Sequence, residues 1–161
     1  MKYRLPTEKD YNILKEYVEE HFANYERSIS ASLGMTNMNY YEWVQKVNRN
    51  SKIADDEWGI YYLYLVFNDK NKLIGLLNIR FSLSEDLREL YGDIGYGVRP
   101  SERKKGYATK MIELALIECK KLGMDKVLIT CNKSNIASAK TIIKNLNVNT
   151  PKPPDIKSIN N

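Results

Sequence analysis

The sequence predicts a mixed α/β domain with a mostly antiparallel sheet flanked by helices. Three observations predict it: two β-rich runs separated by turn residues, a further strand that ends at a proline, and then a helix, a strand and a helix in succession. The length of 161 residues suits one domain, since a chain of this size buries about 70% of its unfolded surface. We expect the domain to span residues 1–146 and a polar, proline-containing tail to span residues 147–161.

The first part of the chain predicts a short strand and two helices. Residues 2–5 suit a strand, and the Pro-Thr pair at 6–7 then begins a helix. The apolar residues of this helix recur at helical spacing and are Leu14, Tyr17, Val18 and Phe22. A loop over residues 28–38 precedes a second helix at residues 40–47. The apolar face of the second helix consists of Trp43, Val44 and Val47.

The central part predicts a hairpin and one more strand. Residues 60–67 and 73–81 have the composition of strands, and the Asn-Asp-Lys-Asn run at 68–71 supplies a turn between them. A polar connection over residues 84–89 leads to a strand at 93–98, which a proline ends.

The pattern then changes to a helical period. Apolar residues recur over four turns at Ala108, Met111, Ile112, Ala115, Cys119 and Leu122. Gly123 is a natural C-terminal cap for this helix. Residues 126–131 predict a short buried strand, and residues 135–146 predict a last helix. Its inner face carries Ala139, Ile142, Ile143 and Leu146.

The net charge of +5 is divided unevenly along the chain. Residues 1–98 carry 12 basic and 15 acidic side chains, a net −3, whereas residues 99–161 carry 13 basic and 5 acidic side chains, a net +8. A basic half is typical of a surface that binds nucleic acid or phosphate. The basic residues gather at one turn instead of following a helix face among aromatics, and they are Arg99, Arg103, Lys104 and Lys105. This clustering favours a small polyphosphate over nucleic acid.

Other classes of site have little support in the sequence. Cys119 and Cys131 stand alone and His21 is the single histidine, so we expect no metal ligand set and no Cys/His catalytic pair. Both thiols suit core positions in a reduced compartment. Residues 1–10 reach charged residues at once, without an apolar run of signal-peptide or membrane length. We therefore expect a cytoplasmic protein without a membrane anchor.

The connection between the strand at 93–98 and the helix after it is typical of an anion site. A helix start brings unpaired backbone N–H groups and the positive end of the helix dipole to one spot. Gly106 lacks a Cβ and lets the backbone approach a pyrophosphate, while the preceding basic residues add charge. A bound anion would explain why basic residues stand at a helix start, where they are otherwise unfavourable.

Two segments resemble a known family. Residues 98–108, Val-Arg-Pro-Ser-Glu-Arg-Lys-Lys-Gly-Tyr-Ala, resemble the acetyl-CoA signature of the GNAT N-acetyltransferase superfamily, in which Arg or Gln, two residues, Gly, one residue and Gly or Ala cradle the pyrophosphate. Residues 131–138, Cys-Asn-Lys-Ser-Asn-Ile-Ala-Ser, resemble the second segment of the family, Asn-x-Ala-Ser. The wider stretch 75–145 is similar to a branch of predicted, uncharacterised acetyltransferases.

The resemblance implies a GNAT fold with acetyl-CoA as cosubstrate and without a metal. It implies that the loop after the strand holds the pyrophosphate, that the strand edge pairs with the pantetheine arm, and that Asn135 binds this arm. The implied cofactor-binding residues are Tyr96, Val98, Arg103, Lys104, Lys105, Gly106, Tyr107, Ala108, Asn135 and Ser138. The residues alone also allow Asn135 to be the N-cap of the last helix, with Ser138 in its first turn, and the two roles are compatible.

The catalytic groups are less marked in the sequence. Acetyl transfer requires an unprotonated amine, a polarised carbonyl and a proton for the leaving thiolate. Asp93 is a candidate base because it shares strand parity with Gly95 and Gly97, and Glu89 and Asp86 are nearby alternatives. The two glycines suit either the bulge with which the family splays two strands or tight packing, and we favour the bulge.

The chain departs from the family pattern in two places. Many relatives carry a tyrosine acid where Ile142 stands, so another tyrosine or water would donate the proton. The tyrosines nearest the motif are Tyr91, Tyr96 and Tyr107. The family also continues into two more strands, whereas residues 147–161 show no strand alternation and suit a disordered or polyproline-II tail. The strand at 126–131 would then expose an edge, which a second copy covers in a homodimer unless the chain is a shortened form with impaired activity.

The sequence thus predicts an enzyme that transfers an acetyl group from acetyl-CoA to a primary amine of a small molecule or peptide. The acidic first half favours a cationic acceptor, and a polyamine, an aminoglycoside-like amine and a protein N-terminus all fit. The alternative is a coenzyme A-binding module with weak or no turnover, because Ile142 and the shortened end remove catalytic parts.

Overall fold

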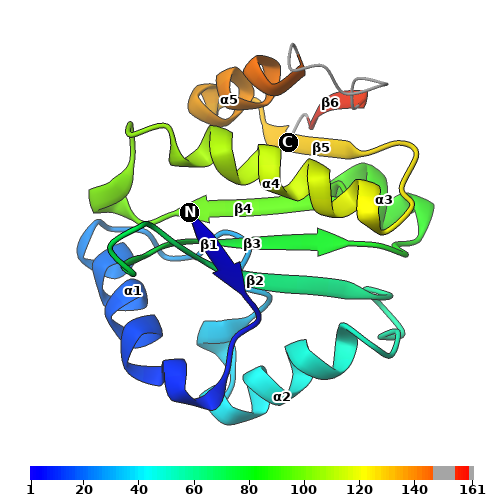
Figure 1. The fold of residues 1–161 in the computed structure, drawn as a ribbon. Helices are drawn as coiled ribbons and strands as arrows, with labels where there is room; N and C mark the ends of the chain where they lie inside the picture. Colours follow the sequence, from blue (N-terminus) through cyan, green and yellow to red (C-terminus); the bar gives the residue numbers. More distant parts are fainter. Residues whose placement is uncertain (147–154, 160–161) are drawn as a thin grey trace.

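A computed structural model describes residues 1–146 and 155–159 of the chain. Four antiparallel strands form one sheet in the order β1-β2-β3-β4, and a parallel pair, β5 and β6, lies beyond β4 (Figure 1). The strands are β1 (Lys2–Arg4), β2 (Tyr61–Phe67), β3 (Leu73–Arg80), β4 (Ile94–Val98), β5 (Leu128–Asn132) and β6 (Asp155–Ile159). The predicted mixed, mostly antiparallel α/β fold is confirmed.

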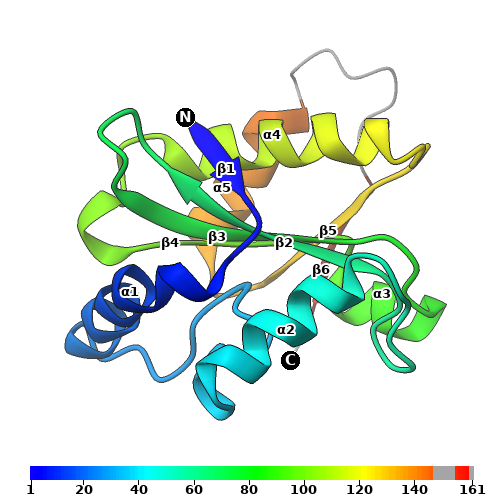
Figure 2. The same cartoon turned by 60° about the horizontal axis from the view of Figure 1, so that its bottom comes forward.

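Helices cover both faces of the antiparallel sheet. Figure 2 shows α1 (Tyr11–Ala23) and α2 (Tyr40–Asn50) on one face and α4 (Tyr107–Lys121) on the other, where α4 packs with α5 (Ile136–Leu146). Every residue of β3 is buried, because its alternating side chains enter a core on each side. β3 is therefore held between two layers, and it is the neighbour of β4 in the sheet.

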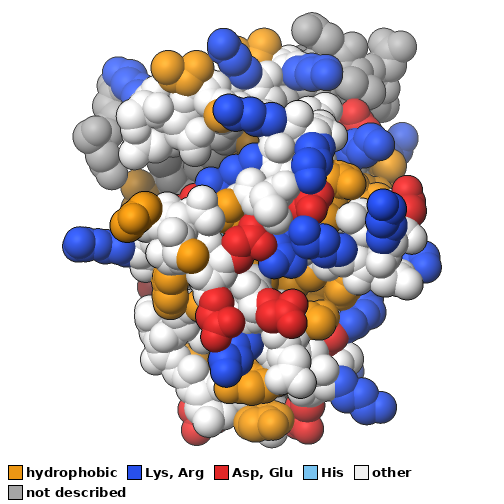
Figure 3. All heavy atoms as spheres, turned by 90° about the vertical axis from the view of Figure 1, so that its left-hand side faces the viewer, with side chains coloured by type: hydrophobic (Ala, Val, Ile, Leu, Met, Phe, Trp, Pro, Cys, Tyr) orange, Lys and Arg blue, Asp and Glu red, His pale blue; other side chains and the backbone are white. Residues whose placement is uncertain are grey.

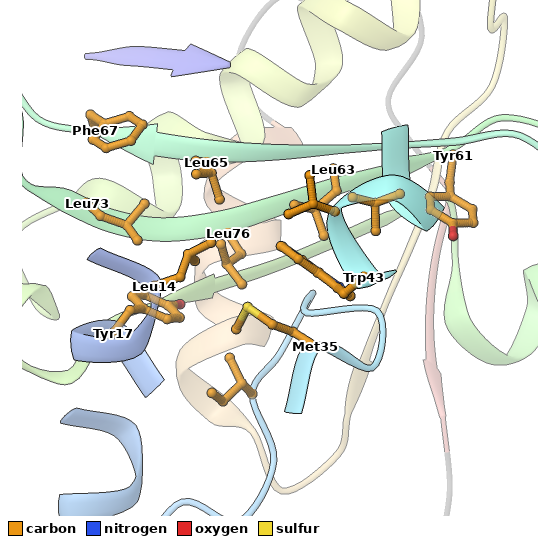
Figure 4. Close-up of a cluster of buried hydrophobic side chains, with 13 residues drawn as sticks. Leu14, Tyr17, Met35, Trp43, Tyr61, Leu63, Leu65, Phe67, Leu73 and Leu76 are labelled. Atoms are coloured by element: carbon orange, nitrogen blue, oxygen red, sulfur yellow. The ribbon is translucent and has the colours of Figure 1, made fainter. Parts of the chain in front are cut away.

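The two cores divide the apolar side chains by strand parity. The core under α1 and α2 (Figure 4) contains Leu14, Tyr17, Trp43, Leu63, Leu65 and Leu76. The core under α4 and α5 contains Val66, Leu77, Ile79, Met111, Ile112 and Ile142. Two residues that we expected on inner helix faces, Phe22 and Ile143, are instead exposed, since each stands at the margin of its apolar stripe.

The C-terminal end of α4 has the predicted glycine cap. Gly123 has a φ of 78°, which a glycine adopts without strain. Its N–H donates to the Lys120 carbonyl (3.1 Å), and the Met124 N–H donates to the Cys119 carbonyl (3.0 Å). This pair of bonds is a Schellman motif, which satisfies the last carbonyls of the helix. Gly123 therefore ends α4 in the manner that the sequence predicted.

The expected polar connection at 84–89 is wrong, because α3 (Glu85–Tyr91) occupies this segment. The Ser84 hydroxyl accepts a hydrogen bond from the Leu87 N–H (3.4 Å), and Glu85 and Asp86 stand in the first turn. Acidic residues and a serine cap stabilise a helix start. None of the residues of α3 is fully buried, so the segment has no apolar period from which a helix could be predicted.

The expected tail without a strand is wrong at β6. This segment pairs in parallel with β5, from Leu128 opposite Asp155 to Asn132 opposite Ile159. An edge strand offers unpaired backbone groups, and a segment can pair with them without an alternating side-chain pattern. The open edge of β5 was the reason to expect a dimer, and β6 covers that edge. The rest of the predicted tail, 147–154 and 160–161, lies outside the described residues.

No helix in the described part of the chain has both the length and the apolar character needed to cross a membrane.

Candidate active site

The site lies where β4 and β5 separate. The Asp93 N–H donates to the Leu128 carbonyl (2.7 Å), and this bond joins the two strands at one end. Beyond it, β4 pairs only with β3 among the described strands. A cleft of about 540 Å³ lies beside the last residues of β4, between the start of α4 and α5. Its wall therefore includes a strand edge without a neighbouring strand.

Asp93 holds β4 and β5 together at the end where the two strands meet. Its Oδ2 accepts the Leu128 N–H (2.7 Å), and Arg88 donates to both carboxylate oxygens, with Nε to Oδ1 and Nη2 to Oδ2 each at 2.8 Å. The Asp93 side chain is buried. Glu89 is exposed on α3, at the opposite end of β4 from the cleft (Figure 1). Neither of the two candidate bases is part of the cleft wall.

The expected bulge at Gly95 and Gly97 is wrong. The register between β3 and β4 runs unbroken from Gly75 opposite Val98 to Ile79 opposite Ile94. A Cβ at Gly97 would lie 2.9 Å from the Ser30 carbonyl oxygen, and one at Gly95 would lie 2.6 Å from Asn78 Oδ1. Tight packing therefore explains both glycines, and the strands splay because their pairing stops after Asp93. Sequence alone allows either reason for a glycine in a strand.

The loop before α4 has the geometry of an anion cradle. Lys104 and Gly106 are both left-handed, with φ of 60° and 79°. Within the described chain, the backbone N–H groups of Lys104, Lys105 and Gly106 donate no hydrogen bond. A Cβ on Gly106 would meet no atom within 4 Å, so this side of the loop is open. Free N–H groups at a helix start, with room before them, fit a diphosphate.

Most basic side chains of this loop are directed elsewhere. The Arg103 Nε donates to the Val98 carbonyl (2.9 Å), and its Nη2 donates to Glu26 Oε2 (2.9 Å). The Lys105 Nζ lies 3.0 Å from Glu102 Oε2. Lys104 makes no ion pair with any described residue. We expected three basic side chains to supply positive charge to an anion. Because Arg103 and Lys105 are paired with carboxylates, Lys104 and the backbone N–H groups remain to supply it.

Arg99, the fourth basic residue of the cluster, is buried. Its Nε donates to Glu20 Oε2 (2.7 Å), and its Nη1 donates to the Leu73 carbonyl (3.0 Å). The Ser101 N–H donates to Glu20 Oε1 (2.7 Å). Burial raises the pKa of Glu20, but the hydrogen bonds from Arg99 and Ser101 outweigh it and lower the pKa to about 2.

The opposite wall of the cleft comes from α5. The hydroxyl groups of Tyr96 and Ser138 lie 2.7 Å apart. Burial raises the pKa of Tyr96, against the smaller opposing effect of the Ser138 hydrogen bond. Asn135 Oδ1 accepts the Ser138 N–H (3.0 Å), which is the geometry of an N-cap, and Asn135 also lines the cleft. Thr141 lines the cleft, whereas Ile142 is buried in the core.

The structure brings together most residues predicted from the sequence. All of the predicted cofactor residues except Lys105 line the cleft. Of the tyrosines near the motif, Tyr96 and Tyr107 line it, while Tyr91 packs against Trp58 with the ring centroids 5.0 Å apart. Sequence reasoning missed Glu26 and Ser30, because they come from the segment after α1 and no local pattern ties them to the loop.

Comparison with known protein families gives a match. The family profile described as "Acetyltransferase (GNAT) domain" matches residues 2–145. The chain belongs to the GNAT acetyltransferase family. No curated protein sequence matches this GNAT chain significantly.

A solved acetyltransferase structure shares the fold of this GNAT chain. The aminoglycoside 6'-N-acetyltransferase of Acinetobacter haemolyticus is 16% identical, and the match covers 100% of this chain and 98% of that one with a TM-score of 0.50. A chimera of the spermidine N-acetyltransferase SpeG from Vibrio cholerae and hSSAT is 17% identical, with a TM-score of 0.47 and 77% of this chain covered. The match spans 65% of the length of the chimera. At this identity the likeness to the first structure shows the fold alone.

Proposed function

We propose that this GNAT chain transfers an acetyl group from acetyl-CoA to a primary amine of a small molecule or peptide. One observation carries the proposal: backbone N–H groups without hydrogen bonds, at the start of α4, border a cleft in which Gly106 leaves open space. Such groups bind phosphates through hydrogen bonds and through the positive end of the helix. Bound acetyl-CoA would supply the thioester, and the chain would bind and orient it.

The cleft offers a place for each part of such a cosubstrate. We assign the diphosphate to the N–H groups of Lys104, Lys105 and Gly106 and to the charge of Lys104. The side of β4 that faces away from β3 has backbone groups for an extended, amide-bearing arm, which would bind in the manner of an added strand. Asn135 lines the same cleft from α5 and is within the wall that this arm would follow.

We propose Tyr96 as the proton donor to the leaving thiolate. Tyr96 lines the cleft, its hydroxyl lies 2.7 Å from Ser138 Oγ, and burial raises its pKa, which favours the phenol that carries the proton. Tyr96→Phe should lower kcat about 100-fold while the Kd of coenzyme A stays unchanged, since a general acid contributes to the chemical step. Tyr91→Phe, at the other end of β4, is the control, and an equal effect of both variants would refute the assignment.

The acceptor amine needs no carboxylate base in this scheme. Glu26 and Glu102 are the carboxylates that line the cleft, and both are ion-paired. We propose that the amine arrives unprotonated and that proximity to the thioester provides much of the rate. The net charge of −3 over residues 1–98 supports a cationic acceptor.

A coenzyme A-binding module with weak or no turnover is the second candidate. The burial of Ile142 favours it, because α5 then presents no tyrosine hydroxyl where many relatives have one. Calorimetry with coenzyme A tests the shared step, and thiol release from acetyl-CoA with a polyamine, an aminoglycoside and a peptide N-terminus separates the two candidates. Binding without thiol release supports the module, and no binding refutes both.

A further inference from the structure

We infer that Glu20 on α1 and Glu26 in the segment after α1 are positioning residues that hold the β4–α4 loop in its diphosphate-binding conformation. The inference rests on the proposed function and deepens it, because it assigns the arginines of the loop to its support instead of to the ligand. Neither glutamate belongs to the phosphate motif, and both act through the arginine that each one binds.

All three nitrogens of the Arg103 guanidinium donate hydrogen bonds, two of them to Glu26. Nη1 and Nη2 donate to the two oxygens of Glu26, and Nε donates to the Val98 carbonyl (2.9 Å). These bonds occupy three of the five N–H groups of Arg103 and fix the orientation of its guanidinium. A bidentate pair of this kind is stronger and more directional than a single contact. It connects the end of β4, the loop and the segment after α1.

A buried histidine supports the Glu26 carboxylate from α1. The His21 Nδ1 lies 2.7 Å from Glu26 Oε2, and the His21 side chain is 2% exposed. The Glu26 N–H also donates to the His21 carbonyl (3.1 Å). Glu26 is therefore fixed by its own backbone and by a buried ring, so it is a rigid partner for Arg103.

Glu20, in the last turn of α1, forms the second contact. It accepts from the Arg99 Nε and from the Ser101 N–H, each at 2.7 Å. The two glutamates together hold residues 99, 101 and 103, on the strand side of the left-handed residues. Figure 3 shows the end of the molecule that carries this loop, where acidic side chains lie among the basic ones instead of leaving a uniformly basic surface.

The two ion pairs affect how freely the loop moves before the ligand binds. Lys104 is left-handed, a conformation that costs an L-residue roughly 1–2 kcal/mol, and the N–H groups next to it have no bonds to stabilise it. A loop of this kind would sample other conformations when free. Two ion pairs on one flank reduce that freedom, so less of the binding energy of the ligand is used to order the loop.

The inference and simple electrostatics predict opposite effects on coenzyme A binding when the charge of Glu26 is removed. Removing a negative charge beside an anion site should tighten the binding of coenzyme A if charge alone decides. Glu26→Gln should instead weaken it about tenfold, which corresponds to one lost charge-assisted hydrogen bond. Arg103→Lys should weaken it as much, although it keeps the charge, and the double variant should lose no more than either single one.

The matched control is Glu16→Gln, which removes the same charge from an exposed site on α1. The Kd of coenzyme A is measured by calorimetry, and kcat with an amine should change less than the KM for acetyl-CoA. In the ligand-free protein, the Arg103 Nη–H signals in a nitrogen–proton spectrum should exchange slowly with water and should exchange fast in Glu26→Gln, which tests the contact without any ligand.

The outcomes separate the two claims. If the wild type binds coenzyme A and both Glu26→Gln and Arg103→Lys bind it more weakly, the inference is supported. Wild-type binding that tightens or stays unchanged in Glu26→Gln overturns the inference and leaves the proposed function intact. A wild type that binds no coenzyme A overturns the proposed function and with it the inference, and an Arg103 signal that exchanges equally fast in both proteins overturns the contact itself.

Discussion

Gly106 and Gly123 bracket α4 with the same backbone conformation and different surroundings. Their φ values are 79° and 78°, and a Cβ on either would meet no atom within 4 Å. Gly106 borders the cleft, whereas Gly123 closes the far end of the helix. The two glycines therefore separate the cost of a strained backbone from the cost of filling the proposed anion site.

Gly106→Glu should abolish the binding of coenzyme A, because its carboxylate would enter the space proposed for the diphosphate. Gly106→Ala adds only a methyl group and roughly 1 kcal/mol of backbone strain, so a smaller loss of affinity is expected. Gly123→Ala carries the same strain and is the control. Calorimetry measures the Kd of each variant, and micromolar binding by Gly106→Glu would contradict the proposed loop.

Glu20 should make stability depend on pH. Its pKa is about 2 in the folded protein, against an ordinary value of 4.5. The unfolded chain therefore takes up the proton first, and the stability from Glu20 is present above pH 4.5 and is lost as the pH falls toward 2. Glu20→Gln should be less stable at pH 7 and should lose less free energy of unfolding than the wild type between pH 4.5 and 2. Urea unfolding at several pH values measures this, and parallel curves for the two proteins would refute it.

At the scale of elements, one carboxylate decides how β4 and β5 meet. Asp93 takes the place of a backbone acceptor for the Leu128 N–H and binds Arg88 from α3, so three elements converge on one buried side chain. The strands separate beyond it, and the cleft exists because they do. The contacts of Asp93 are those of a residue that joins the two strands, and its role as a base stays a prediction that its position outside the cleft wall does not support.

Asp93→Ala should lower the free energy of unfolding by about 2–3 kcal/mol, since it leaves a buried N–H without its acceptor and removes a charged partner. Asp125→Ala, at an exposed position just before β5, is the control and should stay within about 0.5 kcal/mol of the wild type. Urea unfolding at pH 7 gives both values. Equal stability of the two variants would show that Asp93 does not hold the strands together.

At the scale of the whole molecule, β6 forms a second, two-stranded sheet with β5. It pairs along the full length of β5, which would otherwise present its backbone groups at an edge. Unpaired edges promote association between molecules. β6 therefore covers the edge of β5, and the reason for expecting a dimer from the sequence, an open edge at this strand, no longer applies.

Truncation after residue 154 removes β6 and should cause self-association. The expected result is a concentration-dependent increase in mass by light scattering after size exclusion, while the full chain keeps a constant mass. A full chain with Lys157→Ala, which changes one side chain and keeps the backbone pairing, should behave like the wild type. A truncated chain of constant mass would show that β6 does not protect the edge of β5.

The sequence by itself determined the elements whose signals are local. These elements are the hairpin, the amphipathic helix α4, its Gly123 cap and the loop before it. The residues that determine each of them lie close together in the sequence, so a short stretch is enough to predict it. The lining residues that belong to the motif and to the second segment were predicted for the same reason, because both segments are short and contiguous.

Only the tertiary structure decided which charges meet. Arg103 binds Glu26 and Arg99 binds Glu20, across 77 and 79 positions of the chain, and no pattern in either segment marks the other. The same holds for Asp93 and Leu128 and for β5 and β6, because strand pairing and ion pairing depend on distances that the folded backbone sets. A basic cluster that predicts ligand charge in the sequence is, in the folded protein, largely bound to its own carboxylates.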